Sequence, residues 1–224
     1  VGWDDSYSKD NFNTDLEGDG AFICQNSWGD NFGENGFFYI SYYDTNIGTH
    51  NVVYTDIENT DNYDHIYQSD LCGWVGQLGY NKDSIYGANV FTAEGNETLK
   101  AASFYATGKD SQYELYVVRQ FEDETSLEKM IPVASGKLGN AGYYTVDFNQ
   151  GIEVDAGERY AVVLYIITPG SVHPMAIEYA ADEATENVDL DDGESYISAN
   201  GSKWVSVDTV EKSNLCIKAF SDNR

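Results

Sequence analysis

The chain of 224 residues carries 38 acidic and 12 basic residues, which give it a formal net charge of -26 at pH 7. Such a surface repels nucleic acid and anionic lipid, so the charge argues against both as partners. Hydrophobic residues make up 42% of the chain, and no apolar run approaches the roughly 20 residues of a membrane-spanning helix. We therefore expect a globular, mainly β protein without membrane insertion, located outside the cell or on its surface.

The first fifty residues contain two motifs and the pattern of three strands. The sequence VGWDD at residues 1–5 begins a short strand, and NSWG at residues 26–29 follows a strand predicted at residues 21–25. A glycine-rich turn and GENGFFYI at residues 33–40 come next, with a third strand predicted over residues 37–43. Taken alone, Asn26 is a turn residue at a strand end, and Trp28 is an ordinary core residue.

Together these motifs resemble the distal part of papain-family cysteine peptidases, in which the catalytic Asn opens an NSWG motif. In that family a His imidazole activates the Cys nucleophile, and the Asn amide holds the imidazole in one orientation. The resemblance implies that Asn26 orients the catalytic His and that Trp28 shields their hydrogen bond from water. Phe32 stands where the family usually has Trp, and Phe37 where it usually has Tyr, so both keep an aromatic ring.

In this family the catalytic Cys and His precede the position that matches Val1. The resemblance therefore implies an upstream peptidase segment that carries both groups, and a peptide substrate bound by the parent protein. We expect residues 1–50 to be the C-terminal remnant of a papain-like peptidase domain, a part of its β-barrel subdomain. Without nucleophile and base, the 224-residue chain is expected to be inactive by itself.

None of the remaining His and Cys residues fits the family's catalytic positions. We expect His50, His65 and His173 to be interface or loop residues, and Cys24 and Cys216 to be buried free thiols within strands. Cys72 precedes Gly-Trp, which superficially resembles the family's nucleophile. However, the glycine-rich residues that follow do not favour the helix that the family's Cys requires.

From residue 51 onward the pattern changes to many short strands separated by turn signals. Residues 144, 146 and 148 are apolar and alternate with polar ones, as in a half-buried strand. One helical turn is predicted within residues 123–129. The spacing predicts an antiparallel β-sandwich of jelly-roll type over residues 51–224. Its predicted strands lie at residues 52–57, 86–92, 99–107, 113–121, 131–135, 143–148, 160–168, 175–180, 195–198 and 215–220.

The sandwich region also resembles a known family. DHIYQ at 64–68, ANVFT at 88–92, LKAASFY at 99–105 and NLCIKAF at 214–220 are similar to the lectin-like domain that follows papain-type peptidases in some surface proteins of anaerobic bacteria and archaea. The resemblance implies glycan binding, and sugar sites use aromatic faces together with fixed polar groups. The candidates for such a platform are Trp74, Trp204, Tyr67, Tyr80 and Tyr86. The alternative is that most of them pack in the core or at its edges, because most of the aromatic residues, 14% of the chain, have to lie inside.

Acidic residues are densest over residues 182–194, where DLDDGE at 189–194 is similar to part of a calcium-binding loop. Asp189, Asp191 and Asp192 are the candidate ligands of Ca2+. A ligand position of an EF-hand loop falls on Gly193, however, and no flanking helices are predicted, so a solvated acidic loop is the default. No other cofactor is expected.

Two functional hypotheses follow. In the first, the chain is the C-terminal portion of an exported papain-like cysteine endopeptidase, to which it contributes Asn26 and an accessory sandwich. In the second, the chain is a non-catalytic surface module that binds a glycan or a protein.

Overall fold

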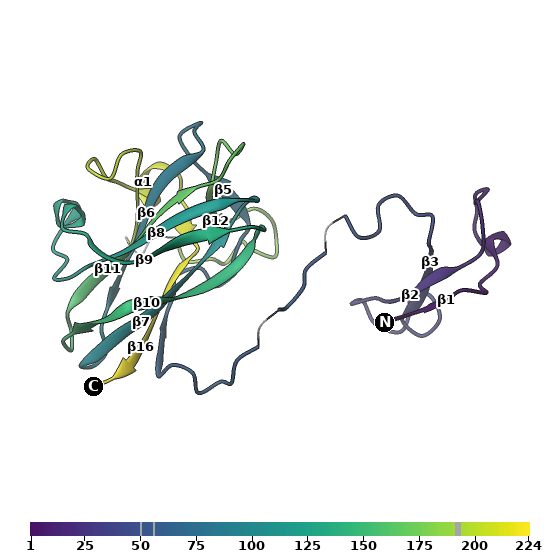
Figure 1. The fold of residues 1–224 in the computed structure, drawn as a ribbon, viewed down its shortest axis with the longest axis horizontal. Helices are drawn as coiled ribbons and strands as arrows, with labels where there is room; N and C mark the ends of the chain where they lie inside the picture. The colour runs from purple at the N-terminus through teal and green to yellow at the C-terminus, as the bar shows by residue number, and fades with distance from the viewer. Residues whose placement is uncertain (50, 56, 191–193) are drawn as a thin grey trace. The chain divides into compact units, whose positions relative to one another are not determined.

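The structure is a computed structural model that describes residues 1–49, 51–55, 57–190 and 194–224. The chain divides into two compact units, Val1–Glu58 and Asn59–Arg224, which we call the N-terminal and the C-terminal unit (Figure 1). Almost all regular structure is antiparallel β-sheet, so the predicted mainly β class is confirmed. Among the described residues, no helix is both long and apolar enough to cross a membrane.

The N-terminal unit contains one three-stranded sheet in the order β1-β2-β3. Its strands are β1 (Gly2–Asp4), β2 (Ala21–Gln25) and β3 (Phe37–Ser41), and a 3-10 turn lies at Lys9–Asn11. Because side chains alternate between the faces of a strand, the pairing register decides which of them share a face. Phe22 in the central strand lies opposite Trp3 on one side and Ile40 on the other, so these three share one face.

The two faces of this sheet differ in how well they are covered. On the face opposite Phe22, the ring of Tyr7 stacks on Tyr39 at 4.2 Å, and Phe12 meets Tyr7 edge-on at 5.5 Å. On the other face, Trp3 exposes 70% of its surface, and Phe22 is also exposed. The loop before β2 therefore covers one face, while the other presents aromatic rings to solvent.

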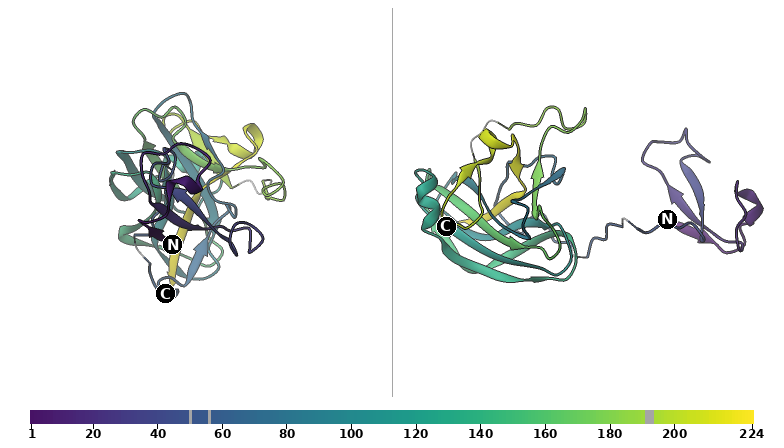
Figure 2. Two further views of the ribbon diagram at one scale, coloured as in Figure 1. Left: turned by 90° about the vertical axis from the view of Figure 1, so that its right-hand side faces the viewer. Right: turned by 90° about the horizontal axis from the view of Figure 1, so that it is seen from above.

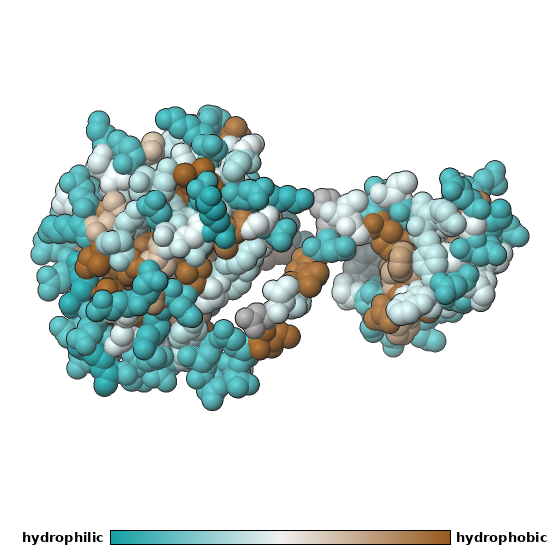
Figure 3. Space-filling view, in the orientation of Figure 1, coloured by the Kyte–Doolittle hydropathy of each residue, from teal (hydrophilic) through white to brown (hydrophobic). Residues whose placement is uncertain are grey.

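The prediction of a strand over residues 52–57 is wrong. The described part of this segment has no regular structure, and Val52, Val53, Tyr54 and Ile57 are all exposed. In Figure 3, hydrophobic side chains, coloured brown, are visible on the chain segment that joins the two units. β-branched residues favour a strand only where a neighbouring strand buries them, and here the described residues supply none.

The C-terminal unit is a β-sandwich with three sheets. A six-stranded sheet has the order β14-β13-β6-β11-β8-β9, a four-stranded one β10-β7-β16-β4, and a small one β15-β12-β5 (Figures 1 and 2). The strands are β4 (His65–Tyr67), β5 (Gly76–Leu78), β6 (Ser84–Thr92), β7 (Glu97–Ala106), β8 (Ser111–Val118), β9 (Ile131–Leu138), β10 (Gly142–Val154), β11 (Arg159–Ile167), β12 (Met175–Glu178), β13 (Ser195–Ser198), β14 (Val205–Ser206), β15 (Asn214–Leu215) and β16 (Ile217–Asn223). A short helix, α1 (Val207–Val210), follows β14.

The main core lies between the two larger sheets. Phe104 and Ile217 contribute to it from the four-stranded sheet, and Leu115, Leu164 and Ile166 from the six-stranded sheet. All five side chains are at most 1% exposed. The period of two in β11 places Tyr160, Val162, Leu164 and Ile166 inward and leaves the residues between them for the outer face.

The outer face of the six-stranded sheet is covered in part by a second apolar cluster. Ala161 and Val163 of β11 pack there beneath Phe121, Leu127 and Trp204. Leu127 belongs to the 3-10 segment Glu124–Glu128, whose capping box is formed by Asp123 and Ser126. This segment was predicted as one helical turn. It covers one end of the outer face and leaves the other end, at Tyr165 and Ile167, without this cover.

Cysteine burial differs from the sequence-based expectation at one position. Cys216 is buried as expected, whereas Cys24 is only half-buried because its face of the N-terminal sheet lacks a cover. Cys72 is exposed. Within the described residues all three are free thiols.

Candidate functional site

Asn26 begins the turn that connects β2 to β3. Its backbone N–H donates to the carbonyl of Gly36 at 2.9 Å, immediately after the last ladder pair of the two strands. Its side-chain Oδ1 accepts from the backbone N–H of Trp28 at 2.7 Å, and its Nδ2 donates to the carbonyl of Phe32 at 3.3 Å. Both ends of the amide therefore hold the turn, and one lone pair of Oδ1 is left for a further donor.

Glycine is required in this turn for steric reasons. Gly33 has a φ of +68°, and a Cβ at this position would lie 2.1 Å from the carbonyl oxygen of Phe37. No side chain other than hydrogen fits there. The glycine-rich spacing after NSWG is therefore part of what positions Asn26.

An exposed aromatic row runs from Trp28 onto the sheet. The indole of Trp28 is 77% exposed and meets the ring of Phe32 edge-on, with centroids 5.3 Å apart. Phe32 in turn meets Phe38 edge-on at 5.6 Å. By the register, Phe38 shares its face with Trp3 and Phe22. We call Trp3, Phe22, Trp28, Phe32 and Phe38 the aromatic face.

The five aromatic residues proposed as a sugar platform lie in different places of the C-terminal unit. Tyr67 packs against the main core, and its hydroxyl donates to both carboxylate oxygens of Glu97, at 2.8 and 2.9 Å. Burial is the main cause that raises the pKa of Tyr67. Tyr80 also packs against this core. These two phenols are partly buried and pack against the core, as in the alternative kept open for most of the five.

Tyr86 and Trp204 do come together, on the outer face of the six-stranded sheet. The two rings meet at 78° with centroids 6.3 Å apart, and Trp204 is buried. Tyr86 also stacks on Tyr165 of the neighbouring strand, with centroids 4.2 Å apart. Trp74 lies elsewhere, tilted against Tyr105 of the four-stranded sheet at 5.7 Å. Of the five candidates for a sugar platform, the structure thus brings Tyr86 and Trp204 into contact.

A hollow of about 270 Å³ lies beside Tyr165 and is lined by residues of β8, β9 and β11. Its polar lining comprises Gln112 and Glu114 of β8 together with Ser135 and Lys137 of β9. Sequence patterns did not single out any of these residues, because they come from two strands whose pairing register the local sequence does not specify. One available signal was Tyr165, an aromatic residue in the mainly aliphatic strand β11.

Hydrogen bonding and burial shape the electrostatics of this hollow. The hydroxyl of Tyr116 donates to the carboxylate of Glu114. Burial, and then this hydrogen bond, raise the pKa of Tyr116, so the phenol stays protonated and donates. The pKa of Tyr86 is also raised, first by burial and then by the nearby Tyr165 and Glu114. Glu114 is therefore the acceptor in a group of neutral phenols.

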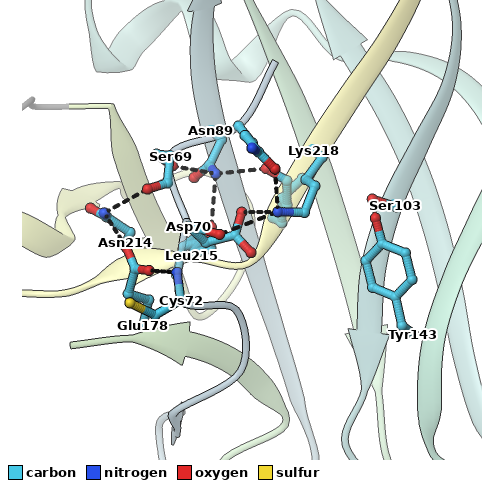
Figure 4. Close-up of polar contacts among 12 residues, drawn as sticks. Ser69, Asp70, Cys72, Asn89, Ser103, Tyr143, Glu178, Asn214, Leu215 and Lys218 are labelled. Carbon is cyan, nitrogen blue, oxygen red and sulfur yellow. Dashed lines mark hydrogen bonds and ion pairs between the residues drawn. The ribbon is translucent and has the colours of Figure 1, made fainter. Parts of the chain in front are cut away.

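A buried polar cluster lies where β6 of the six-stranded sheet meets β16 of the four-stranded sheet (Figure 4). The carboxylate of Asp70 is fully buried and lies 2.9 Å from the ammonium of Lys218, which also donates to Gln68 at 2.7 Å. Asn89 donates to the carbonyls of Leu215 and Ile217, both at 2.9 Å. These contacts tie β6, β16 and the segment before β5 together, so we assign them a structural role.

Next to it, oxygen atoms gather around the side chain of Asn214 (Figure 4). Its Nδ2 reaches Glu178 Oε1 at 3.0 Å and the carbonyls of Ser69 and Asp189 at 3.1 and 2.8 Å. Its Oδ1 is buried and has no hydrogen-bond partner among the described residues. Carboxylate, carbonyl and amide oxygens are the ligands that Ca2+ takes.

The calcium expectation stays a prediction. Asp189 is the one candidate that the structure describes, and its backbone carbonyl faces Asn214. Asp191 and Asp192 lie outside the described residues. Within the described chain, no group of three or more His, Cys, Asp or Glu side chains gathers as metal ligands do.

The histidines that the structure describes have local partners. A ring nitrogen of His65 lies 2.9 Å from Asn223 Oδ1, and the other lies 3.5 Å from Glu94 Oε2. The hydrogen bond with Asn223 is the main cause that raises the pKa of His65. The backbone N–H of His173 donates to the hydroxyl of Ser171 in its loop. His50 lies outside the described residues.

Residues 66–221 match the family described as the lectin-like domain. The structure is also similar to Cwp84, a clostridial cysteine protease, in the form obtained after propeptide cleavage, with 28% identity and a TM-score of 0.77 over 99% of this chain and 56% of that chain. A second similar structure contains the cysteine protease and lectin-like domains of Cwp84, a surface-layer-associated protein of Clostridium difficile. There the identity is 27% and the TM-score 0.74, over 99% of this chain and 50% of that one. The chain thus spans about half the length of these structures. None of the curated proteins matches the chain.

Proposed function

The chain belongs to the lectin-like domain family, and from this we propose that it is the C-terminal portion of an exported papain-like cysteine endopeptidase. In this proposal the N-terminal unit completes a peptidase domain, and the lectin-like unit binds carbohydrate. The partners are an upstream peptidase segment with the catalytic Cys and His, a peptide substrate and a glycan. The proposal is carried by the likeness to a cysteine protease with a lectin-like domain over 99% of this chain.

The aromatic face supports the proposed peptidase context. Trp3 and Trp28 are 70% and 77% exposed, on a sheet whose opposite face is already covered. Contiguous exposed aromatic surface of this kind marks a place where another segment packs. A three-stranded sheet also gains its stability mainly from such packing. The upstream peptidase segment is the proposed cover.

Asn26 takes the role of orienting residue in this proposal. A His ring N–H donates to the remaining lone pair of Asn26 Oδ1, which fixes the tautomer and the plane of the imidazole. The opposite ring nitrogen then pairs with the Cys thiol and holds it as the thiolate. The amide orients the ring without adding a charge, and the exposed indole of Trp28 is available to keep water from this hydrogen bond.

The test uses Asn26→Ala in the full-length parent protein. We expect kcat to fall roughly hundredfold with little change in KM, because a misoriented catalytic group costs about this factor. The pH profile of kcat/KM should shift as well, which a merely structural role would not cause. Asn13→Ala, at an exposed position of the same unit, is the matched control. A turnover of Asn26→Ala within twofold of wild type rejects the assignment.

We propose from its family that the C-terminal unit binds carbohydrate. The stacked rings of Tyr86 and Tyr165, beside the hollow on the outer face of the six-stranded sheet, support this proposal. A surface location follows from the same relationship, since Cwp84 is described as surface-layer-associated. The alternative function is a non-catalytic module that binds a glycan or a protein on the cell surface. A thiol-directed peptidase probe distinguishes the two, because the alternative requires that the parent protein takes no label at a Cys paired with a His.

For Ca2+, the residues that fit are Glu178, Asn214 and the carbonyl of Asp189. The buried Oδ1 of Asn214 has no other partner among the described residues, and a hard cation would satisfy it. A bound cation would neutralise part of the buried negative charge at Glu178. We propose that these groups hold Ca2+ together with the acidic stretch that follows Asp189.

A further inference from the structure

We propose that the carbohydrate site of the lectin-like unit is the hollow over β8, β9 and β11, and that its ligand is a neutral hexopyranosyl unit of a polysaccharide. The sugar ring lies against Tyr165, and its hydroxyls bond to Gln112, Glu114 and Lys137. This inference rests on the proposed carbohydrate binding and adds the location and the ligand class.

The strand register places these side chains in two adjacent rows on one face. In the first row, Tyr165 lies opposite Glu114, which lies opposite Ser135. In the second, Ile167 lies opposite Gln112, which lies opposite Lys137. Directly opposite residues have Cβ atoms about 4.5–5.5 Å apart, and rows two residues apart are separated by roughly 7 Å. Such a patch has the dimensions of one pyranose ring with its hydroxyls.

The polar groups of the hollow are available for a ligand. The side chains of Gln112, Ser135 and Lys137 form no hydrogen bond or ion pair with the residues that the structure describes. Glu114 accepts from Tyr116 through one carboxylate oxygen and keeps the other for a ligand. The set therefore offers amide, ammonium, hydroxyl and carboxylate groups, which can both donate to and accept from sugar hydroxyls.

The aromatic surface is held in place from below. Tyr165 stacks on Tyr86 at 4.2 Å, and Tyr86 packs edge-on against the buried indole of Trp204. Trp204 belongs to the apolar cluster with Phe121 and Leu127. A ring fixed in this way loses little freedom when a ligand binds, which lowers the entropic cost of binding.

Volume and charge limit the class of ligand. A hollow of about 270 Å³ is close to the lower end of the range of about 300–1,000 Å³ for small-molecule sites, so it accommodates one sugar unit at a time. The net charge of -26 repels polyanions. Within the hollow the single carboxylate, Glu114, is balanced by the single ammonium, Lys137. A neutral sugar fits this balance.

The exposed aromatic group around Trp74 lacks these features. Trp74 and Tyr143 are 37% and 44% exposed and both lie against Tyr105. The hydroxyls of Tyr143 and Ser103 already bond to each other, and Lys218 is held by Asp70 (Figure 4). The nearby polar groups satisfy one another, so Trp74 serves as the matched control.

The experiment is isothermal titration calorimetry of the full 224-residue chain with neutral gluco-, manno- and galacto-oligosaccharides, and with polygalacturonate as the anionic counterpart. We expect one neutral oligosaccharide to bind. Tyr165→Ala should weaken its affinity at least tenfold, whereas Trp74→Ala should leave it unchanged. The double variant Gln112→Ala with Lys137→Ala changes only exposed side chains and tests the site even if Tyr165→Ala fails to fold.

Each of the following three outcomes would overturn part of the proposal. If a neutral oligosaccharide binds and both hollow variants bind as wild type does, the location is overturned while carbohydrate binding by this unit stands. If only polygalacturonate binds, the ligand class is overturned. If the wild-type chain binds none of these probes, the carbohydrate-binding part of the proposed function fails, and this inference fails with it.

Discussion

The two units differ in how completely the faces of their β-sheets are buried. In the C-terminal unit both faces of the six-stranded sheet carry buried clusters, one against the four-stranded sheet and one beneath Trp204. In the N-terminal unit one face is covered by Tyr7, and the aromatic face is open. Among the hydrophobic residues described in this unit, Ala21 alone is fully buried. The sandwich therefore has a core of its own, whereas one face of the smaller sheet stays open among the described residues.

The strongest test of this comparison is truncation of an aromatic residue in each unit. Phe104→Ala should destabilise the C-terminal unit by about 3–5 kcal/mol, because Phe104 is only 1% exposed and a cavity remains. Trp3→Ala should change the stability of the 224-residue chain by no more than about 0.5 kcal/mol, as for other exposed positions. Urea unfolding monitored for each unit measures both. A cost of several kcal/mol for Trp3→Ala would mean that the aromatic face is covered within this chain.

Charged residues provide the second test. Lys218→Met leaves the buried carboxylate of Asp70 without its cation and should cost roughly 3 kcal/mol. Lys9→Met in the N-terminal unit removes only an exposed contact of Nζ with the carbonyl of Leu16 and should cost much less. Equal losses in denaturant unfolding would contradict the difference in burial between the units.

Calcium is expected to act on one unit only. If Glu178, Asn214 and the acidic stretch after Asp189 hold Ca2+, a free concentration of 100 times Kd stabilises the C-terminal unit by about 2.7 kcal/mol. EDTA should reverse the gain, and Glu178→Gln should abolish it. The unfolding of the N-terminal unit should not respond. Thermal unfolding with and without Ca2+ measures the effect, and an unchanged C-terminal transition would leave the acidic stretch as a solvated loop.

Acid should weaken the C-terminal unit through Glu158. Burial raises the pKa of this carboxyl, but the hydrogen bonds from Arg119 at 2.9 and 2.6 Å, together with backbone donors, outweigh it and lower the pKa overall. The stabilisation is therefore present above the unfolded-state pKa and is lost as pH falls through the folded-state pKa. Glu158→Gln should remove about 1.5 kcal/mol at pH 7 and nearly nothing at low pH. A loss that is the same at both pH values would exclude this linkage.

The smallest expected effect is that of His65, and its sign is opposite. Since its pKa is raised in the folded state, its stabilisation is complete below the unfolded-state pKa of about 6.5 and disappears as pH rises through the folded-state pKa. His65→Gln should therefore destabilise the C-terminal unit more at pH 5 than at pH 8. Thermal unfolding at the two pH values measures the difference. A larger loss at pH 8 would show that the charged form of His65 does not stabilise the fold.

Most strands were predictable from the local sequence pattern, and some of the shortest were not. The bounds of β2 and β13 agree with the prediction at residues 21–25 and 195–198. β4 (His65–Tyr67) and β5 (Gly76–Leu78) were missed, because three residues carry no period and these segments become strands only by pairing with β16 and β12. The reverse error occurred at residues 52–57, which have the composition of a strand and no strand beside them among the described residues.

Local sequence was sufficient to predict the β class, the turn that holds Asn26 and the lectin-like relationship. These depend on neighbours along the chain: side chains alternate with period two, Gly33 permits a positive φ, and Asn26 bonds to Trp28 and Phe32 a few residues away. The tertiary structure was needed to show that Tyr86 and Trp204 meet while Tyr67 and Tyr80 pack against the core. It alone brought Gln112, Glu114, Lys137 and Tyr165 to one hollow. The reason is that the order and register of strands arise from contacts between distant segments, which no local pattern specifies.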